Sequence, residues 1–490
     1  MITKRNLNIY VCVTGLILTV CISCKKLIAI PEPVDTQTTN KVFATDMQAN
    51  SAMVGVYSVL INDVSGNSTG YSGFATGLST ILGSLSSDEL SIDLFAGTSF
   101  NPYNTNKILV NSPYIPTLWS SAYQSIYGSN AVIEGIAAST SPKLNTATKI
   151  QLTAEAKFMR AFSYLYLVNF FGDVPLVLTI DFNQTANMTR TPAQEVKAQI
   201  IKDLLDAKSG LPADFSGSKT NERIRPNKWA AAALLARAYL YNGDYANALA
   251  QANEVIGQSQ LFQLNDDLNH VFLKNNNEAI WQLQQSNVAS IRGNATPEGY
   301  SFSVYRSPAD SKYYGFVISD VLEQTFEAGD QRKEDWLFPL LKDGKTVYYL
   351  NKYKIGLNNS SVNAPITEYA TVMRLAEQYL IRSEARVLAG NQLELAIGDL
   401  NVLRHRAGLG DLPLTLSHDQ VLAAIAKERR TEFFGEWGHR WFDLIRTGKA
   451  HDVLSAMPGK QPWWGDYQFL YPIPPDEIMT DHKLIQNPGY

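Results

Sequence analysis

The chain has 490 residues, of which 45% are hydrophobic and 18% are charged, and its formal net charge is −4. This composition excludes a disordered chain, and the lack of a basic excess argues against a nucleic-acid-binding protein. The length is sufficient for a sizeable hydrophobic core in one large body or two lobes.

The first 24 residues have the pattern of a secretory signal. Two basic residues precede an apolar stretch that is too short for a membrane span, which needs about 20 residues. All three cysteines lie here, and Cys24 follows the small residue Ser23, where bacterial lipoproteins are cleaved and acylated. We therefore predict a lipoprotein signal peptide over 1–23, lipid attachment at Cys24 and a lipidated tether over 24–45. A plain signal peptide in which Cys24 is incidental remains the alternative.

Apolar residues recur at three- and four-residue steps in several later segments, which predicts amphipathic helices. We expect the first helix to begin at Asp46, with this residue as its N-cap. The predicted helical segments are 46–61, 119–136, 148–171, 192–211, 227–256, 372–406 and 418–447. Short strands are predicted at 279–283 and 346–350.

Residues 227–256 and 372–406 carry the small-residue and aromatic pattern of tetratricopeptide helix pairs. In the first pair, small residues allow two helices to approach closely and Gly243 permits the turn between them. Such repeats cannot bury their apolar faces alone, so we expect them to stack. The predicted fold class is mainly α, with tetratricopeptide-like helix pairs as a scaffold, long loops and a few short strands.

Two long stretches, 62–116 and 287–320, lack helical periodicity and are rich in Gly, Ser, Asn and aromatic residues. Long irregular stretches inside a compact protein are usually functional. A flat ring covers the apolar face of a sugar or peptide, and Asn supplies directional hydrogen bonds. The predicted ligand-binding residues are Phe95, Phe100, Asn101, Tyr103, Tyr300, Tyr305, Tyr313 and Tyr314. The alternative is that each ring packs its loop onto the helical body.

A charged segment, 428–446, raises the question of catalysis, because paired carboxylates can serve acid–base chemistry. Its charges are spaced for i,i+3 and i,i+4 ion pairs and alternate with aromatic residues, which favours a structural role. The Gly-x-Ser-x-Gly motif at 66–70 lacks the apolar strand that precedes a hydrolase nucleophile, which favours a flexible loop. The six histidines show no pair at metal-ligand spacing. We predict no metal, no cofactor and no enzymatic activity.

Several segments together resemble the SusD/RagB family of nutrient-binding outer-membrane lipoproteins, and they occur in the family's order over nearly the whole chain. The matching segments are EAKFMRA (155–161) with FGDVPL (171–176), DLN (399–401) with RHRAGL (404–409), ERRTE (428–432) with GHRWFDLIR (438–446), and YPIP (471–474) with QNPGY (486–490). One departure is Trp437, which separates Glu436 from Gly438 where the family commonly has Glu next to Gly. Trp463 and Trp464 lie near the family-like C-terminus and fit either packing or exposure.

The resemblance implies an outer-membrane lipoprotein, facing the cell surface of a Bacteroidetes-type bacterium. It would capture a nutrient oligomer, a glycan in most members and a peptide in some, and deliver it to a SusC-like TonB-dependent transporter. Residues 46–310 would form a helical-repeat part with ligand loops, and residues 311–490 a SusD/RagB-like part of the same body. Two other classes remain open. One is a surface lipoprotein glycan hydrolase; the other is a repeat scaffold that binds only proteins.

Overall fold

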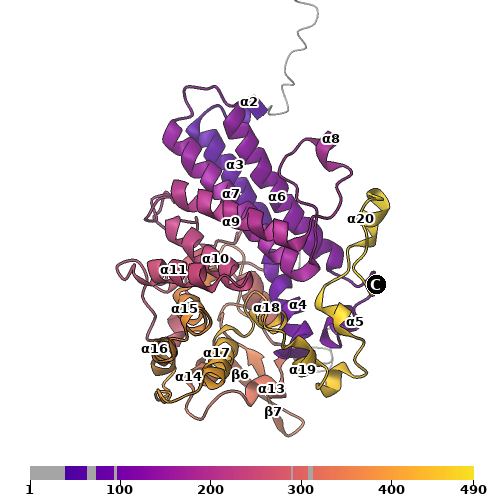
Figure 1. Cartoon of the computed structure of the whole chain (residues 1–490), viewed down its shortest axis with the longest axis vertical. Helices are drawn as coiled ribbons and strands as arrows, with labels where there is room; N and C mark the ends of the chain where they lie inside the picture. The colour runs from indigo at the N-terminus through magenta and orange to yellow at the C-terminus, as the bar shows by residue number, and fades with distance from the viewer. Residues whose placement is uncertain (1–38, 63–72, 93–96, 289–290, 307–312) are drawn as a thin grey trace, which may run out of the picture.

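A computed structural model of the chain describes residues 39–62, 73–92, 97–288, 291–306 and 313–490 (Figure 1). Helices dominate it and the strands are few and short, so the mainly α fold is confirmed. None of the helices that the structure describes is long and apolar enough to cross a membrane. The main hydrophobic core extends from Phe43 to Ile473 and therefore crosses both predicted parts of the body.

The long helices pack side by side in one row, with the N-terminal members in the upper half of Figure 1 and the C-terminal members below. The row consists of α3 (Asp46–Ile61), α6 (Ile115–Ala138), α7 (Thr146–Phe171), α9 (Ala193–Gly210), α10 (Lys228–Tyr241), α11 (Tyr245–Ile256), α15 (Leu375–Gly390), α16 (Leu393–Arg406) and α17 (His418–Phe433). The pairs predicted at 227–256 and 372–406 are confirmed. They stack through α11 and α15, which pack together although residues 257–374 separate them in the chain.

Shorter helices connect the row to the irregular regions. They are α2 (Thr39–Val42), η1 (Phe74–Leu78), α4 (Ser79–Ser86), α5 (Gly97–Asn104), α8 (Phe182–Thr185), η2 (Leu268–His270), α12 (Pro297–Phe302), α13 (Asp320–Glu323), α14 (Gln331–Trp336), α18 (His439–Arg446), α19 (Ala450–Leu454), η3 (Pro458–Lys460), η4 (Asp466–Phe469) and α20 (Pro475–Thr480).

In the part of the chain that the structure describes, antiparallel strands form three small sheets. The four-stranded sheet has the order β1 (Leu90–Ile92), β5 (Phe316–Ile318), β7 (Lys345–Leu350), β6 (Leu337–Lys342). The two-stranded sheets are β2 (Ala279–Leu283) with β8 (Ala370–Arg374) and β3 (Tyr305–Arg306) with β4 (Tyr313–Tyr314). Both predicted strands are confirmed, as β2 and β7.

Two local predictions are wrong. The N-cap of α3 is Thr45, whose extended backbone lets its side chain accept a hydrogen bond from the Gln48 amide, and Asp46 is the first helical residue. The two stretches predicted as irregular contain the helices α4, α5 and α12, and all eight residues of α4 are buried. A helix that is buried on every side shows no polar face, so its sequence lacks the period by which helices are recognised. At Gly83 an added Cβ would lie 2.7 Å from the Gly438 Cα, so glycine permits the contact with α18.

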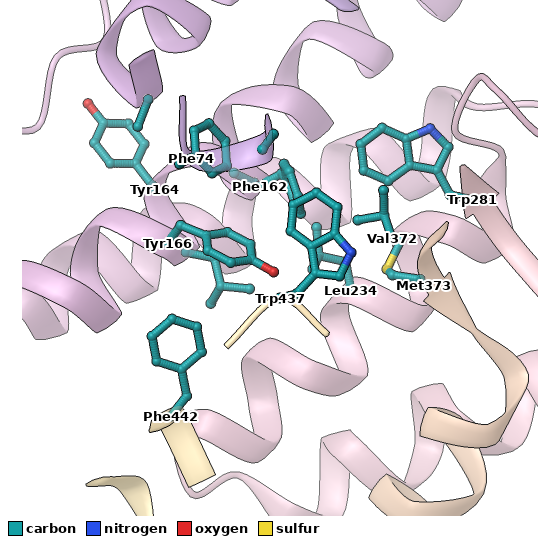
Figure 2. Close-up of a cluster of buried hydrophobic side chains, with 14 of the residues drawn as sticks. Phe74, Phe162, Tyr164, Tyr166, Leu234, Trp281, Val372, Met373, Trp437 and Phe442 are labelled. Atoms are coloured by element: carbon teal, nitrogen blue, oxygen red, sulfur yellow. The ribbon is translucent and has the colours of Figure 1, made fainter. Parts of the chain in front are cut away.

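The centre of the core is a cluster of aromatic rings between α7, α10 and the C-terminal region (Figure 2). The ring of Phe162 lies 5.2 Å from that of Trp281 and 5.7 Å from that of Trp437. Trp437 adopts a left-handed backbone with φ 51°, and its indole nitrogen donates to the Thr371 carbonyl at 2.7 Å. The residue that departs from the common family pattern therefore fills the middle of the core.

The charged segment forms a buried network that connects several elements. Glu432 in α17 accepts hydrogen bonds from Arg374 at the end of β8 and from Arg406 at the end of α16, and Arg332 in α14 lies 3.1 Å away. Arg446 and Asp443 form the expected i,i+3 pair, but the pairs of Glu432 reach other elements. Burial alone would raise the pKa of Glu432, yet the three arginines hold it well below its usual range.

Replacing Arg374 by methionine is expected to destabilise the protein by about 3–5 kcal/mol, because it leaves buried carboxylates without their partner. The free energy of unfolding from denaturant titration measures this loss. The matched control is Lys345→Met, which removes an ion pair with Asp320 whose side chains are 65% and 71% exposed and which costs less than about 1 kcal/mol. Equal losses in the two variants would contradict the role given to the network.

Candidate ligand-binding surface

The two long irregular stretches of the sequence meet in the structure. β1 from the first pairs with β5 from the second, with Leu90 opposite Ile318 and Ile92 opposite Phe316. The pairing continues into a hydrogen bond from the Ser319 amide to the Glu89 carbonyl at 2.9 Å. This strand pair brings α5 and α12, the helices that carry predicted ligand residues, to one part of the molecule.

Phe316 is the hydrophobic centre of this junction. Its ring lies 5.3 Å from that of Phe100 in α5 and 5.7 Å from that of Phe302 in α12, both in edge-to-face arrangements. Phe100 also stacks on Tyr114 at 4.6 Å. Both helices thus pack on one ring, and we use the name α5–α12 surface for two residues that they expose in full or in part, Asn101 and Tyr300.

The side chains of the predicted ligand residues differ in how exposed they are. Asn101 is exposed and Tyr300 is half-buried, so both reach the surface. Phe100 is 5% exposed and Tyr103 is fully buried, with its hydroxyl donating to the Pro113 carbonyl. Neither buried ring presents a face to solvent. Phe100 and Tyr103 therefore follow the alternative, in which a ring packs its loop onto the helical body.

Other predicted residues lie outside what the structure describes. This holds for Phe95, for the motif at 66–70 and for Cys24. For three tyrosines the backbone is described and the side chain is not: Tyr305 pairs with Tyr314 and Arg306 with Tyr313 in the β3–β4 hairpin. The prediction that these rings contact a ligand stays a prediction.

Asparagine side chains hold the loops that frame the surface. Asn294 donates to the Pro365 carbonyl at 2.9 Å and accepts from the Ser361 amide at 2.9 Å. Asn358 donates to the Val304 carbonyl at 2.6 Å, just before the β3–β4 hairpin. At Gly293 an added Cβ would lie 2.6 Å from the Ser361 carbonyl carbon, so only glycine permits this close approach. The framework of the surface is thus fixed by hydrogen bonds within the protein.

Two buried carboxyl groups lie beneath the surface, and no sequence pattern marked either of them. Burial raises the pKa of Glu89 to about 7, and burial likewise raises that of Glu298 in α12 to about 7. Within the described residues neither Glu298 oxygen has a hydrogen-bond partner, although Thr80 lies nearby. Raised pKa values occur in acid–base sites. Here the two residues are only 1% and 3% exposed, so neither carboxyl group is available to a substrate in this arrangement.

The described part of the chain contains no group of three His, Cys, Asp or Glu side chains that could hold a metal ion. Two large hollows lie elsewhere. One, of about 800 Å³, is lined by α7, α9 and the C-terminal tail; the other, of about 780 Å³, lies between α15, α17 and α18. The second is lined mainly by helices, and the first partly by irregular C-terminal residues. The α5–α12 surface lies in stretches without long helices, where recognition residues usually lie.

Comparison with protein families gives two matches. The model described as "SusD family" matches residues 341–490, and the model described as "Starch-binding associating with outer membrane" matches residues 82–240. SusD-like protein P2 of Formosa agariphila is 30% identical over 425 residues, which cover 77% of this chain and 81% of the relative. Starch-binding protein SusD of Bacteroides thetaiotaomicron is 25% identical over 426 residues, which cover 71% and 74% of the two chains.

Solved structures share the fold. A laminarin-binding SusD-like protein is 25% identical and superposes with a TM-score of 0.70, covering 91% of this chain and all of its own. Surface glycan-binding protein A of Bacteroides thetaiotaomicron, solved with laminarihexaose, is 22% identical with a TM-score of 0.74 and covers 90% of this chain and 99% of its own.

The two buried carboxyl groups predict an unusual pH dependence. Because native Glu298 holds its proton more tightly than the unfolded chain, the contribution of this group to stability is greatest at low pH and falls by about 3 kcal/mol as pH rises from 4.5 to about 7. Glu298→Gln is expected to reduce this fall, as measured by the free energy of unfolding at pH 5 and pH 8.

The control for this experiment is Glu327→Gln. Its partners Arg404 and Lys427 lower the pKa of Glu327 to about 2, so its contribution to stability is lost only as pH falls toward 2. This variant should show the same change between pH 5 and pH 8 as the unaltered protein. An unchanged pH profile in Glu298→Gln would contradict the raised pKa.

Proposed function

Because the chain belongs to the SusD family, we propose that it captures an oligosaccharide at the α5–α12 surface and delivers it to a SusC-like TonB-dependent transporter. The observation that carries this proposal is the β1–β5 pairing around Phe316, which unites the two irregular stretches. The relatives named for binding starch and laminarin support a glycan over a peptide as the ligand. Capture needs no bond to be made or broken, so the protein acts by binding alone.

The proposed contacts follow from side-chain chemistry. Tyr300 stacks its ring on the apolar face of a sugar, and the Asn101 amide bonds hydroxyl groups as both donor and acceptor. The rings of Phe95, Tyr305, Tyr313 and Tyr314 extend this platform in the proposal. Phe100 and Tyr103 act from the interior, where they hold α5 in place.

The transporter contact is proposed on the outer side of α3 and α6, which pack on each other. These two long helices contain one charged residue each, Asp46 and Glu134. Met47, Val54 and Tyr127 on them are 74%, 54% and 58% exposed. Exposed apolar side chains on an almost uncharged helical surface are typical of a protein contact. The tether before α3 would connect this side of the body to the lipid at Cys24.

The anchor is tested by Cys24→Ala. Without the thiol no diacylglyceryl group can be attached to residue 24. The body then lacks the lipid that would hold it in the membrane. We expect the variant to move from the membrane fraction to the soluble fraction. Immunoblotting of both fractions after cell lysis measures this change. Ser23→Ala, which keeps a small residue before the thiol, is the control and should stay in the membrane. Retention of the Cys24→Ala protein in membranes would contradict lipid anchoring.

Ligand capture is tested on the body that follows Cys24, by calorimetric titration with a panel that includes laminarihexaose, maltohexaose and short peptides. We expect saturable binding of one glycan, recovered intact by chromatography afterwards. Tyr300→Ala should weaken this binding about threefold to tenfold, because the stacked ring contributes about 0.5–1.5 kcal/mol. Asn101→Ala should weaken it as well, because its amide bonds are lost.

The matched control is Phe338→Ala, which removes a ring that is 43% exposed on β6 and should leave the affinity unchanged. Breakdown of the ligand would contradict a pure binding function and favour the hydrolase. Binding of peptides without glycans would contradict the ligand class. Binding of neither would favour a scaffold that recognises only proteins.

A further inference from the structure

A tryptophan pair follows α19 at the surface of the molecule. Trp464 is 42% exposed, and Pro462 before the pair is exposed as well. Trp463 is half-buried, with its ring 6.1 Å from that of Phe469, so it holds this segment on the core. The segment thus presents one large flat ring to solvent beside a ring that is fixed.

Polar groups next to the pair are held in a defined arrangement. One oxygen of Asp466 accepts a hydrogen bond from the Trp463 indole nitrogen at 3.1 Å and one from the His451 Nδ1 at 2.8 Å. The side chains of Asp466 and His451 nevertheless remain 51% and 56% exposed. The exposed Asp466 carboxylate and His451 imidazole are therefore held beside the half-buried Trp463, which precedes the exposed Trp464 in the chain.

This segment is attached to the end of α5. Lys460 donates to the carbonyl of Asn104, the last residue of α5, at 3.1 Å. Lys107 donates to the Gln461 carbonyl at 3.1 Å, and Gln468 accepts from the Ile108 amide at 2.8 Å. The tryptophan pair is consequently joined by hydrogen bonds to the end of the helix that carries Asn101.

From this arrangement we propose that Trp464, Asp466 and His451 form a second glycan subsite, which binds a later part of the chain held at the α5–α12 surface. The inference rests on the proposed glycan capture and extends it. The apolar face of a pyranose ring stacks on Trp464, and a sugar hydroxyl donates to the Asp466 carboxylate. An exposed carboxylate two residues after Trp464 favours a hydroxyl-rich ligand over a lipid surface, because lipid tails cannot satisfy its oxygens.

Two subsites on one surface make affinity depend on chain length. Once the first part of a glycan is bound, the second part meets Trp464 at a high effective concentration, provided that the chain is long enough to span both. A short oligosaccharide occupies one subsite only. The second subsite therefore adds affinity for polymers and adds none for a trisaccharide that binds at the first.

The test begins with affinity electrophoresis of the unaltered body in gels that contain laminarin, starch or other polysaccharides, to find a polymer that binds. Calorimetry then compares that polymer with its own trisaccharide. Trp464→Ala and Asp466→Ala are each expected to weaken polymer binding about tenfold and to leave trisaccharide binding within about twofold. Trp464→Phe, which keeps a flat ring, should retain most of the polymer affinity.

Two controls separate the possible failures. Phe182→Ala removes a ring that is 75% exposed on α8 and should leave both affinities unchanged. Tyr300→Ala should weaken binding of the polymer and of the trisaccharide alike.

If Trp464→Ala binds the polymer like the unaltered protein while Tyr300→Ala binds it more weakly, the second subsite is wrong and the proposed function stands. If the unaltered protein binds no polysaccharide, the second subsite is wrong, and if it binds no oligosaccharide either, the proposed function is wrong as well. Loss of transporter or vesicle binding in Trp464→Ala, with polymer binding unchanged, would identify another occupant and overturn the subsite.

Discussion

The buried carboxylate of Glu432 imposes the strongest constraint on this structure. Removing a charge from water costs several kcal/mol, so it is tolerated only when partners with good geometry surround it. Here Arg374, Arg406 and Arg332 supply those partners from β8, α16 and α14. These elements are far apart in the chain, so the pairs form only when the strand pair and the C-terminal helices have reached one particular arrangement. The network thus fixes the arrangement of β8, α14, α16 and α17 at the C-terminal end of the row of helices.

The proposed ligand-binding region depends on the same assembly. Asp88, which is 1% exposed just before β1, pairs with Arg430 of α17 at 2.9 Å and with Arg440 of α18 at 2.8 Å. These pairs fix β1 on the helices that carry the buried network. β1 in turn holds β5, whose Phe316 supports both α5 and α12. The proposed recognition surface on α5 and α12 therefore has a rigid base.

The distribution of charge suits a protein that binds a neutral ligand. The strongest ion pairs lie inside the body, where they hold elements together, and the α5–α12 surface is represented by an amide and a phenol ring at Asn101 and Tyr300. Sugars are recognised by flat rings and directional hydrogen bonds, and neither requires a net charge. The long helices provide the remaining surface, of which the almost uncharged side of α3 and α6 is suited to a protein partner.

Local periodicity was enough to predict the long amphipathic helices, the two helix pairs and the strands β2 and β7, because it records which side of each element faces the core. The sequence also marked the stretches that carry Asn101 and Tyr300, although the structure places both residues in short helices. The helical state of α4, the burial of Phe100 and Tyr103 and the pairing of Glu432 across elements could be found only in the folded protein. Each of these depends on neighbours that are distant in the chain, and such contacts leave no regular spacing in the sequence.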